Sequence, residues 1–300
     1  MTNNKEGKVR NLNSDAANSF KLLSSEARPL DATSRCCFVC GGEMRPFMKK
    51  SFGMKNLDAC EYVRCENCGL VIAKTIYEMP RRTWQALNRE CHAAYQNTNE
   101  LAIDPNWLPR LKAQAQIISE LINIGVLDKN ANAVDYGAGD GKLSSFITEK
   151  NWLKKFDAYM SRPNENYLSA EDLKPESFDF VITCSVFEHL LGAEDVEKIF
   201  ALLKPEGIMA LHTLVCEEVP QDPNWFYLQP VHCTFWTNAA MQKIFKQYEF
   251  NSCAYHVESR LWFMFRDRAK FLKTCADTSS KTWIFANDFV DYWKAKPYRK

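Results

Sequence analysis

The sequence lacks two features that would place the protein at a membrane. It has no run of about 18 consecutive apolar residues, the minimum for a transmembrane helix, and its first residues lack the apolar core of a signal peptide. Both absences predict a cytoplasmic protein that has no membrane partner.

The sequence also lacks an excess of either charge. Lys and Arg number 38 and Asp and Glu 37, which leaves a formal net charge of +1. A protein that binds a phosphate backbone usually carries a basic field, so nucleic acid is not the expected partner. Residues 1–34 are polar and have little apolar periodicity, which predicts a disordered tail.

Cysteine, in contrast, is abundant. Six of the 12 cysteines lie between residues 36 and 68, and two CxxC pairs, Cys37/Cys40 and Cys65/Cys68, stand out among them. The cytosol keeps thiols reduced, and paired CxxC turns hold tetrahedral zinc, so the spacing predicts a structural, zinc-ribbon-like module with four cysteine ligands over residues 35–80. Cys36 or Cys60 could replace a neighbour, although we interpret both as ordinary small side chains.

Beyond residue 110 the pattern alternates between helices and strands. A helix is predicted over 110–124 and another over 193–203, and apolar strands over 133–136, 156–160, 178–184 and 208–215, with a weaker one near 167–168. This alternation is typical of an α/β fold with a parallel sheet. A helix near 238–247 and two strands, 252–257 and 261–266, then predict an antiparallel hairpin at the end.

A glycine-rich turn follows the first of these strands. Asp135 ends the strand, and Gly137, Ala138 and Gly139 let the backbone approach a ligand closely. Acidic residues on both sides, Asp135 and Asp140, would repel a pyrophosphate. They favour a ligand that carries a sulfonium and an ammonium group.

This turn resembles the first motif of class I S-adenosylmethionine-dependent methyltransferases. The resemblance implies a Rossmann-like seven-stranded sheet over residues 110–300 and S-adenosylmethionine as the cofactor. It also implies that Asp157 binds the ribose, and that Ala170 and Glu171 contact adenine through their backbone, because Ser169 stands where the family commonly has Asp. The expected cofactor-binding residues are Asp135, Gly137, Ala138, Gly139, Asp157, Ala170, Glu171, Cys184 and Ser185, with Tyr95 as a lid residue in a linker over 81–109.

Methyl transfer to a hydroxyl or carbon acceptor requires a base, and histidine is the natural candidate. Of the five histidines, His232 lies in an aromatic insertion over residues 217–237, and His189 follows the predicted fourth strand. Either could be the base. The insertion's aromatic side chains could stack on a sugar or simply form the core of a lid, and the sequence leaves both interpretations open.

The cysteine module, the methyltransferase motifs and the Pro-His-aromatic loop together resemble bacterial methyltransferases of deoxysugars and surface polysaccharides. This resemblance implies a sugar or nucleotide-sugar substrate that is methylated on oxygen or carbon. Two alternatives remain: an RNA methyltransferase with a zinc module, and a non-catalytic scaffold. The sequence does not predict the oligomeric state.

Overall fold

The computed structural model describes residues 35–97, 106–158, 166–278 and 281–291. The predicted disordered tail lies outside these residues. Within them, no helix combines the length and the apolar character needed to cross a bilayer.

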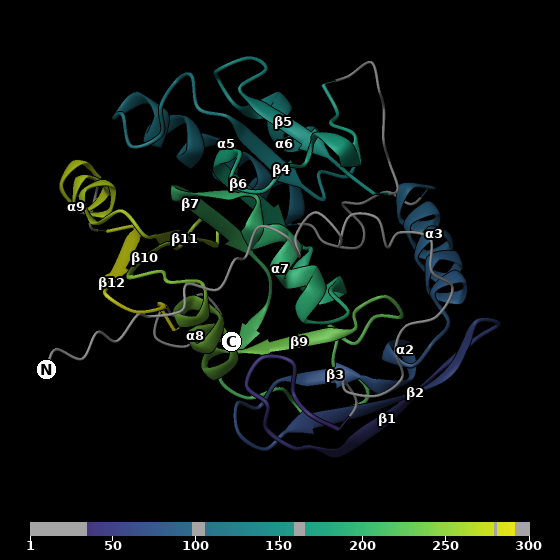
Figure 1. Cartoon of the computed structure of the whole chain (residues 1–300). Helices are drawn as coiled ribbons and strands as arrows, with labels where there is room; N and C mark the ends of the chain where they lie inside the picture. Colours follow the sequence, from purple (N-terminus) through teal and green to yellow (C-terminus); the bar gives the residue numbers. More distant parts are fainter. Residues whose placement is uncertain (1–34, 98–105, 159–165, 279–280, 292–300) are drawn as a thin grey trace, which may run out of the picture.

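The larger part of the chain forms one seven-stranded sheet in the order β12-β10-β11-β7-β6-β4-β5, which confirms the predicted fold (Figure 1). Four strands run parallel, and the terminal hairpin and the last strand are antiparallel to their neighbours. The strands are β4 (Ala133–Tyr136), β5 (Leu153–Phe156), β6 (Phe178–Cys184), β7 (Leu203–His212), β10 (Ser252–His256), β11 (Leu261–Phe265) and β12 (Trp283–Ala286).

Helices cover both faces of this sheet, because its central strands are apolar on both sides. In β6, Phe180 and Ile182 point into one core and Val181 into the other. The first core includes side chains of three helices, α5 (Trp107–Asn123), α6 (Lys142–Phe146) and α9 (Arg268–Asp277). The second includes side chains of α7 (Ala193–Ala201) and α8 (Asn238–Gln247).

Three expectations about this sheet are corrected. Residues 159–160 of the strand predicted over 156–160 lie outside the described residues, and the strand itself lies at Leu153–Phe156, because pairing with β4 places the buried Leu153 beside Ala133. The strand expected near 167–168 is reduced to a single bridge between Lys155 and Tyr167. The strand predicted over 208–215 begins at Leu203 and ends at His212. The seventh strand is instead β12, which the sequence analysis did not predict.

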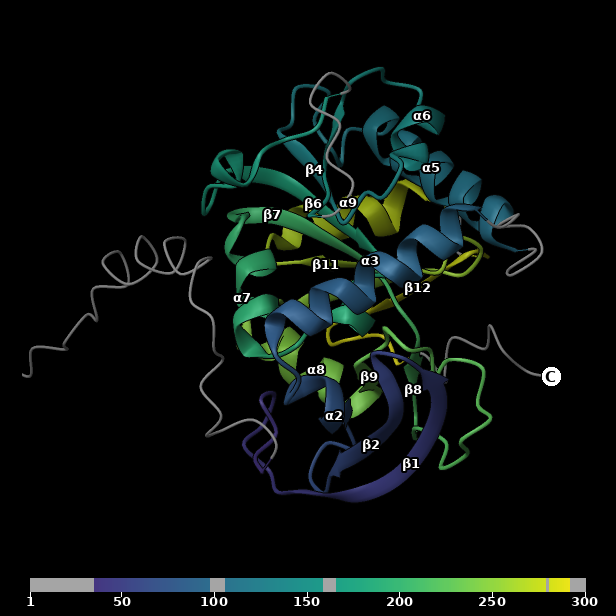
Figure 2. The same cartoon turned by 90° about the vertical axis from the view of Figure 1, so that its right-hand side faces the viewer.

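A second sheet, in the order β1-β2-β3-β9-β8, carries the cysteine module (Figure 2). Its first three strands are β1 (Met44–Met54), β2 (Leu57–Cys65) and β3 (Val71–Ala73), and two helices follow, α2 (Lys74–Tyr77) and α3 (Arg81–Asn97). The other two strands, β8 (Val215–Cys216) and β9 (Thr234–Thr237), come from a distant part of the sequence. The segment 35–80 therefore shares its sheet with the aromatic insertion.

Candidate functional site

The glycine-rich turn leaves the sheet at the carboxyl end of β4. The backbone amides of Gly137 and Ala138 both donate to the carbonyl of Phe156, at 2.8 and 3.0 Å. Gly137 has a φ of +82°, and a Cβ there would lie 2.4 Å from Cγ2 of Val186. Only glycine is compatible with both the backbone conformation and this contact.

Gly139 occupies a different environment in the same turn. Its amide donates to Oδ2 of Asp157 at 2.8 Å, and its carbonyl accepts from the Tyr167 hydroxyl at 2.7 Å. A Cβ at Gly139 would meet nothing within 4 Å among the described residues. The turn thus presents bare backbone to open space, with the expected ribose-binding carboxylate at its side.

Asp135 lies directly behind this turn. Its side chain is 3% exposed, and Oδ1 has no hydrogen-bond partner among the described residues. Burial raises the pKa of Asp135 to about 7, the carboxylate of Asp157 adds to the rise, and Lys155 opposes it. A buried carboxylate with one unpartnered oxygen beside an open backbone fits a ligand with a positive charge, such as S-adenosylmethionine.

Because the pKa of Asp135 is raised, we expect the free energy of unfolding of the ligand-free protein to depend on pH. The folded-state pKa of Asp135, about 7, lies above the ordinary value of 3.8, so the folded state binds this proton more tightly. The stabilisation is complete below about pH 4 and is lost as the pH rises through 7, by about 1.4 kcal/mol per unit. We expect Asp135→Asn to unfold at a higher temperature than the wild type at pH 8. Thermal unfolding at pH 8 and 5 measures this gap, and an equal gap at both values would contradict the prediction.

The other predicted cofactor residues lie at the ends of neighbouring segments. Ala170 and Glu171 belong to a short helix, η2 (Ala170–Asp172), and the hydroxyl and amide of Ser169 both donate to Asp172 at 2.8 Å. Ser169 therefore caps this helix. Cys184 ends β6, and Ser185 follows with a φ of +56°.

Cys184 and Ser185 lie at the same edge of the sheet as the glycine-rich turn, since β4 and β6 are parallel neighbours. Their roles in cofactor binding stay predictions. The backbone of Tyr95 belongs to α3, but its side chain is outside the described residues, so its role as a lid is untested.

The two candidate histidines lie next to each other. His189 ends a short helix, η3 (Phe187–His189), that follows β6, and His232 precedes β9. Their ring centroids are 5.0 Å apart with the planes almost perpendicular. Nδ1 of His189 donates to the Val231 carbonyl at 2.9 Å, and Nδ1 of His232 donates to the Tyr227 carbonyl at 2.8 Å. A carbonyl can only accept, so Nδ1 carries the proton and Nε2 is the basic nitrogen of each neutral ring.

The histidine pair adjoins the glycine-rich turn through Val186. The side chain of Val186 lies against Gly137, and its carbonyl accepts from the amide of His189 at 2.9 Å. The structure thus brings the predicted base candidates and the predicted cofactor turn to the same edge of the sheet.

A buried polar network beside the histidines was missed by the sequence analysis. Glu188 is 2% exposed and accepts from the hydroxyls of Thr213 and Tyr227, both at 2.8 Å. Burial and the Glu188 charge raise the pKa of Tyr227 well above its usual range, so it stays a donor. The Tyr227 ring packs on His232 at 4.5 Å. The sequence did carry one signal for this network: Glu188 is an acidic residue among apolar ones, shortly after the buried strand β6.

The aromatic insertion divides into buried and exposed side chains. Phe235 and Trp236 are each 1% exposed and belong to the core, so neither is available to a ligand. Phe226 is 67% exposed. Of the two interpretations left open, the core role holds for Phe235 and Trp236, and ligand stacking remains a prediction for Phe226.

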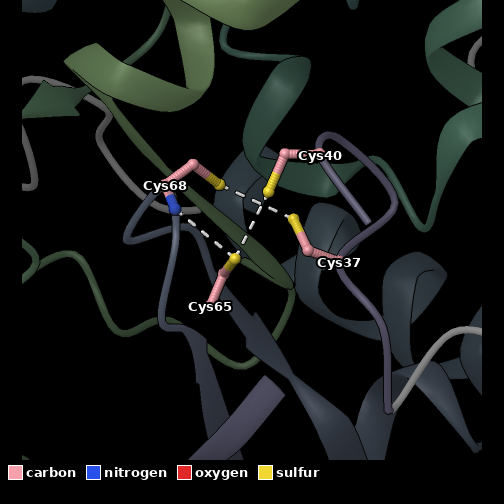
Figure 3. A group of neighbouring side chains, drawn as sticks. All are labelled: Cys37, Cys40, Cys65 and Cys68. Atoms are coloured by element: carbon pink, nitrogen blue, oxygen red, sulfur yellow. Dashed lines mark hydrogen bonds between the residues drawn. The ribbon is translucent and has the colours of Figure 1, made fainter. Parts of the chain in front are cut away.

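The four predicted metal ligands converge at one end of the second sheet. Figure 3 shows the sulfurs of Cys37, Cys40, Cys65 and Cys68 turned toward one another. All four atoms lie within 4.8 Å of each other, and two pairs are 3.5 and 3.6 Å apart. Tetrahedral zinc with bonds of about 2.3 Å separates its sulfurs by about 3.8 Å, so this group can hold a zinc ion.

Cys36 and Cys60 are not part of this group. Cys36 is exposed, and Cys60 is buried within β2, where burial raises its pKa. The preference for two CxxC pairs over their neighbours is consistent with this geometry.

Comparison with known proteins agrees with this arrangement. The sequence family described as a methyltransferase domain matches residues 110–254. A search of curated proteins found no match.

Several solved structures are similar at low identity. One is the 1,6-didemethyltoxoflavin-N1-methyltransferase of Burkholderia thailandensis with bound S-adenosylhomocysteine, at 11% identity, a TM-score of 0.43, and coverage of 73% of this chain and 97% of that chain. Another is DesVI of Streptomyces venezuelae, at 14% identity and a TM-score of 0.41, with coverage of 57% of this chain and 100% of that chain. A third is a SAM-dependent methyltransferase of Thermotoga maritima, at 15% identity and a TM-score of 0.39, with coverage of 61% of this chain and 100% of that chain.

The family match covers the glycine-rich turn, both histidines and most of the sheet. Residues 110–254 therefore form a class I methyltransferase domain, and the protein is an S-adenosylmethionine-dependent methyltransferase.

Proposed function

We propose that the protein methylates a sugar, free or nucleotide-linked, on oxygen or carbon, with His232 as the general base. The observation that carries this proposal is the meeting of His232 and His189 beside the glycine-rich turn. A methyltransferase whose acceptor needs no deprotonation has little use for a basic nitrogen held in one tautomer. An acceptor hydroxyl, or a carbon beside a ketone, does require one.

S-adenosylmethionine supplies a methyl group that a positively charged sulfur has already activated. Asp135, Asp157 and the glycine-rich turn would hold this cofactor, which would supply the methyl group to the acceptor atom and leave as S-adenosylhomocysteine. Nε2 of His232 takes the acceptor's proton, and the Tyr227 carbonyl, which holds Nδ1–H, stabilises the imidazolium that forms. Glu188 fixes Tyr227 through the hydroxyl bond. In this scheme Glu188 is a positioning residue.

Two features support a sugar acceptor. Phe226 offers an exposed aromatic face in the insertion, and sugars stack on such faces. The sequence also combines the cysteine pairs with a Pro-His-aromatic loop, as in the sugar methyltransferases that it resembles. The balanced charge disfavours RNA as the acceptor.

We further propose that the four cysteines hold one structural zinc ion. Four thiolates complete its coordination sphere and leave no position for water, so the metal takes no part in the transfer.

An acceptor comparison tests the proposed function. The purified protein is incubated with S-adenosylmethionine labelled in the methyl group, and with either a panel of nucleotide-linked deoxysugars or total RNA. Label in a sugar is the expected result. Label in RNA alone, or no transfer to any sugar by a protein that binds S-adenosylhomocysteine, would overturn the sugar assignment.

A further inference from the structure

We infer that the cysteine cluster positions the two histidines, and that Phe38, inside the Cys37–Cys40 turn, is the side chain through which it does so. The inference rests on the proposed function, because it concerns the base of that reaction. It assigns to the Cys37–Cys40 turn a role beyond stabilising the cysteine module. Three separate contacts connect the cysteine module, residues 35–80, to the histidine-bearing segments.

The first contact is the strand pairing of β3 with β9. The amide of Ala73 donates to the carbonyl of Cys233 at 2.8 Å, and the amide of Cys233 donates to the carbonyl of Glu188 at 2.7 Å. Cys233 directly follows His232, and Glu188 directly precedes His189. One residue of the insertion is therefore held from one side by the cysteine module and from the other by η3.

The second contact is a hydrogen bond from the hydroxyl of Thr237 to the carbonyl of Cys68. Cys68 is one of the four converging cysteines, and Thr237 is the last residue of β9. The same hydroxyl accepts from the amide of Ala240 and so caps α8. The strand that follows His232 is thus tied at its far end to a predicted metal ligand.

The third contact is a path of packed rings that runs from the partly buried Phe38 to the buried Trp236 and Phe187. Phe38 meets Trp236 edge-on, with ring centroids 6.0 Å apart, and Trp236 packs on Phe187 at 5.4 Å. The indole nitrogen of Trp236 also donates to the Phe187 carbonyl at 2.9 Å. Phe187 is the first residue of η3, whose last residue is His189.

Close-packed interiors transmit displacement, because few voids exist to absorb it. Phe38 lies between Cys37 and Cys40, so closing the turn around a metal fixes the position of its ring. The ring then supports Trp236, and Trp236 supports the segment that bears His189. Residues distant from the chemistry can in this way control the alignment of a base.

Phe38→Ala tests the role of this ring, with Phe38→Leu as the conservative variant. Met54→Ala is the matched control, because Met54 is also partly buried in the second sheet but lies at the far end of β1. Each zinc-loaded variant is studied with histidine labelled in the ring, and the signals of His189 and His232 are assigned from His→Gln variants. S-adenosylhomocysteine binding and the pH profile of kcat are measured on the same samples.

We expect Phe38→Ala to keep its zinc and its S-adenosylhomocysteine affinity. The ring signals of His189 and His232 should move while that of His256 stays. The value of kcat should fall about 10- to 100-fold, and the acid limb of its pH profile should shift. Phe38→Leu should restore most of kcat, and Met54→Ala should behave as the wild type. Unmoved histidine signals together with a wild-type kcat in Phe38→Ala would overturn the inference.

A second variant keeps the test decisive if Phe38→Ala loses its zinc. Trp236→Phe removes the indole hydrogen bond and alters the contact with Phe38 while every residue of the cysteine turn is kept, and the same shifts are expected. A wild-type protein that transfers no methyl group to any acceptor would refute the proposed function instead. In that case the histidine signals alone would decide whether the cluster positions the pair.

Discussion

Replacing His232 with glutamine should lower kcat for methyl transfer by about 10²- to 10⁴-fold, the usual contribution of a general base. Glutamine is close to histidine in size but cannot accept the acceptor's proton. The affinity for S-adenosylhomocysteine should change little, because the glycine-rich turn and Asp135 are left intact. Single-turnover transfer with a saturating acceptor measures the chemical step directly.

His212→Gln is the matched control. His212 ends β7, at the same edge of the sheet, and its Nδ1 likewise donates to a backbone carbonyl, that of Arg260, at 3.0 Å. Its loss should leave kcat in the wild-type range. Equal losses in both variants, or an unchanged rate in His232→Gln, would remove His232 from the mechanism.

Replacing Cys65 with serine should abolish metal binding and lower the free energy of unfolding by several kcal/mol, because structural zinc sites supply about 10 kcal/mol of apparent binding free energy. Cys65 ends β2, and a Cβ at Gly42 would lie only 2.9 Å from its sulfur, so the turns pack tightly around it. Without the metal, packing against the surrounding core alone would have to hold these turns together. Metal content and thermal unfolding are the measurements.

Cys60→Ser provides the comparison, since Cys60 lies on the same strand and is fully buried but is not one of the four converging cysteines. We expect this variant to keep one zinc ion per chain and to lose only about 1–3 kcal/mol, the penalty of a buried hydroxyl. A Cys65→Ser protein that retains its metal and unfolds at the same temperature as Cys60→Ser would contradict the proposed zinc site.

Much of the sheet could be predicted because its signals are local. The apolar run at Phe178–Cys184, the strand at Ala133–Tyr136 and the helix at Asn238–Gln247 have the predicted bounds. The strand at Leu153–Phe156 was misplaced because Lys154 and Lys155 interrupt its apolar pattern. Their register against β4 is decided by pairing. The edge strand β12 was missed for the same reason, since it exists only by pairing with β10.

The site shows the same division. The sequence named His189 and His232 separately, but nothing local placed them 5.0 Å apart. Glu188, Thr213 and Tyr227 lie in three separate segments of the chain, and no local sequence pattern indicates that their side chains form one network.

By itself, then, the sequence determined the α/β class, the ligand-binding turn after Asp135 and the two cysteine pairs, because each depends on residues a few positions apart. Only the tertiary structure decided that β9 joins the sheet of the cysteine module, with Ile72 beside Thr234, and that the histidines meet beside Glu188. Such contacts join segments that are far apart along the chain. Their formation depends on how whole elements pack, which periodicity and spacing along the chain do not encode.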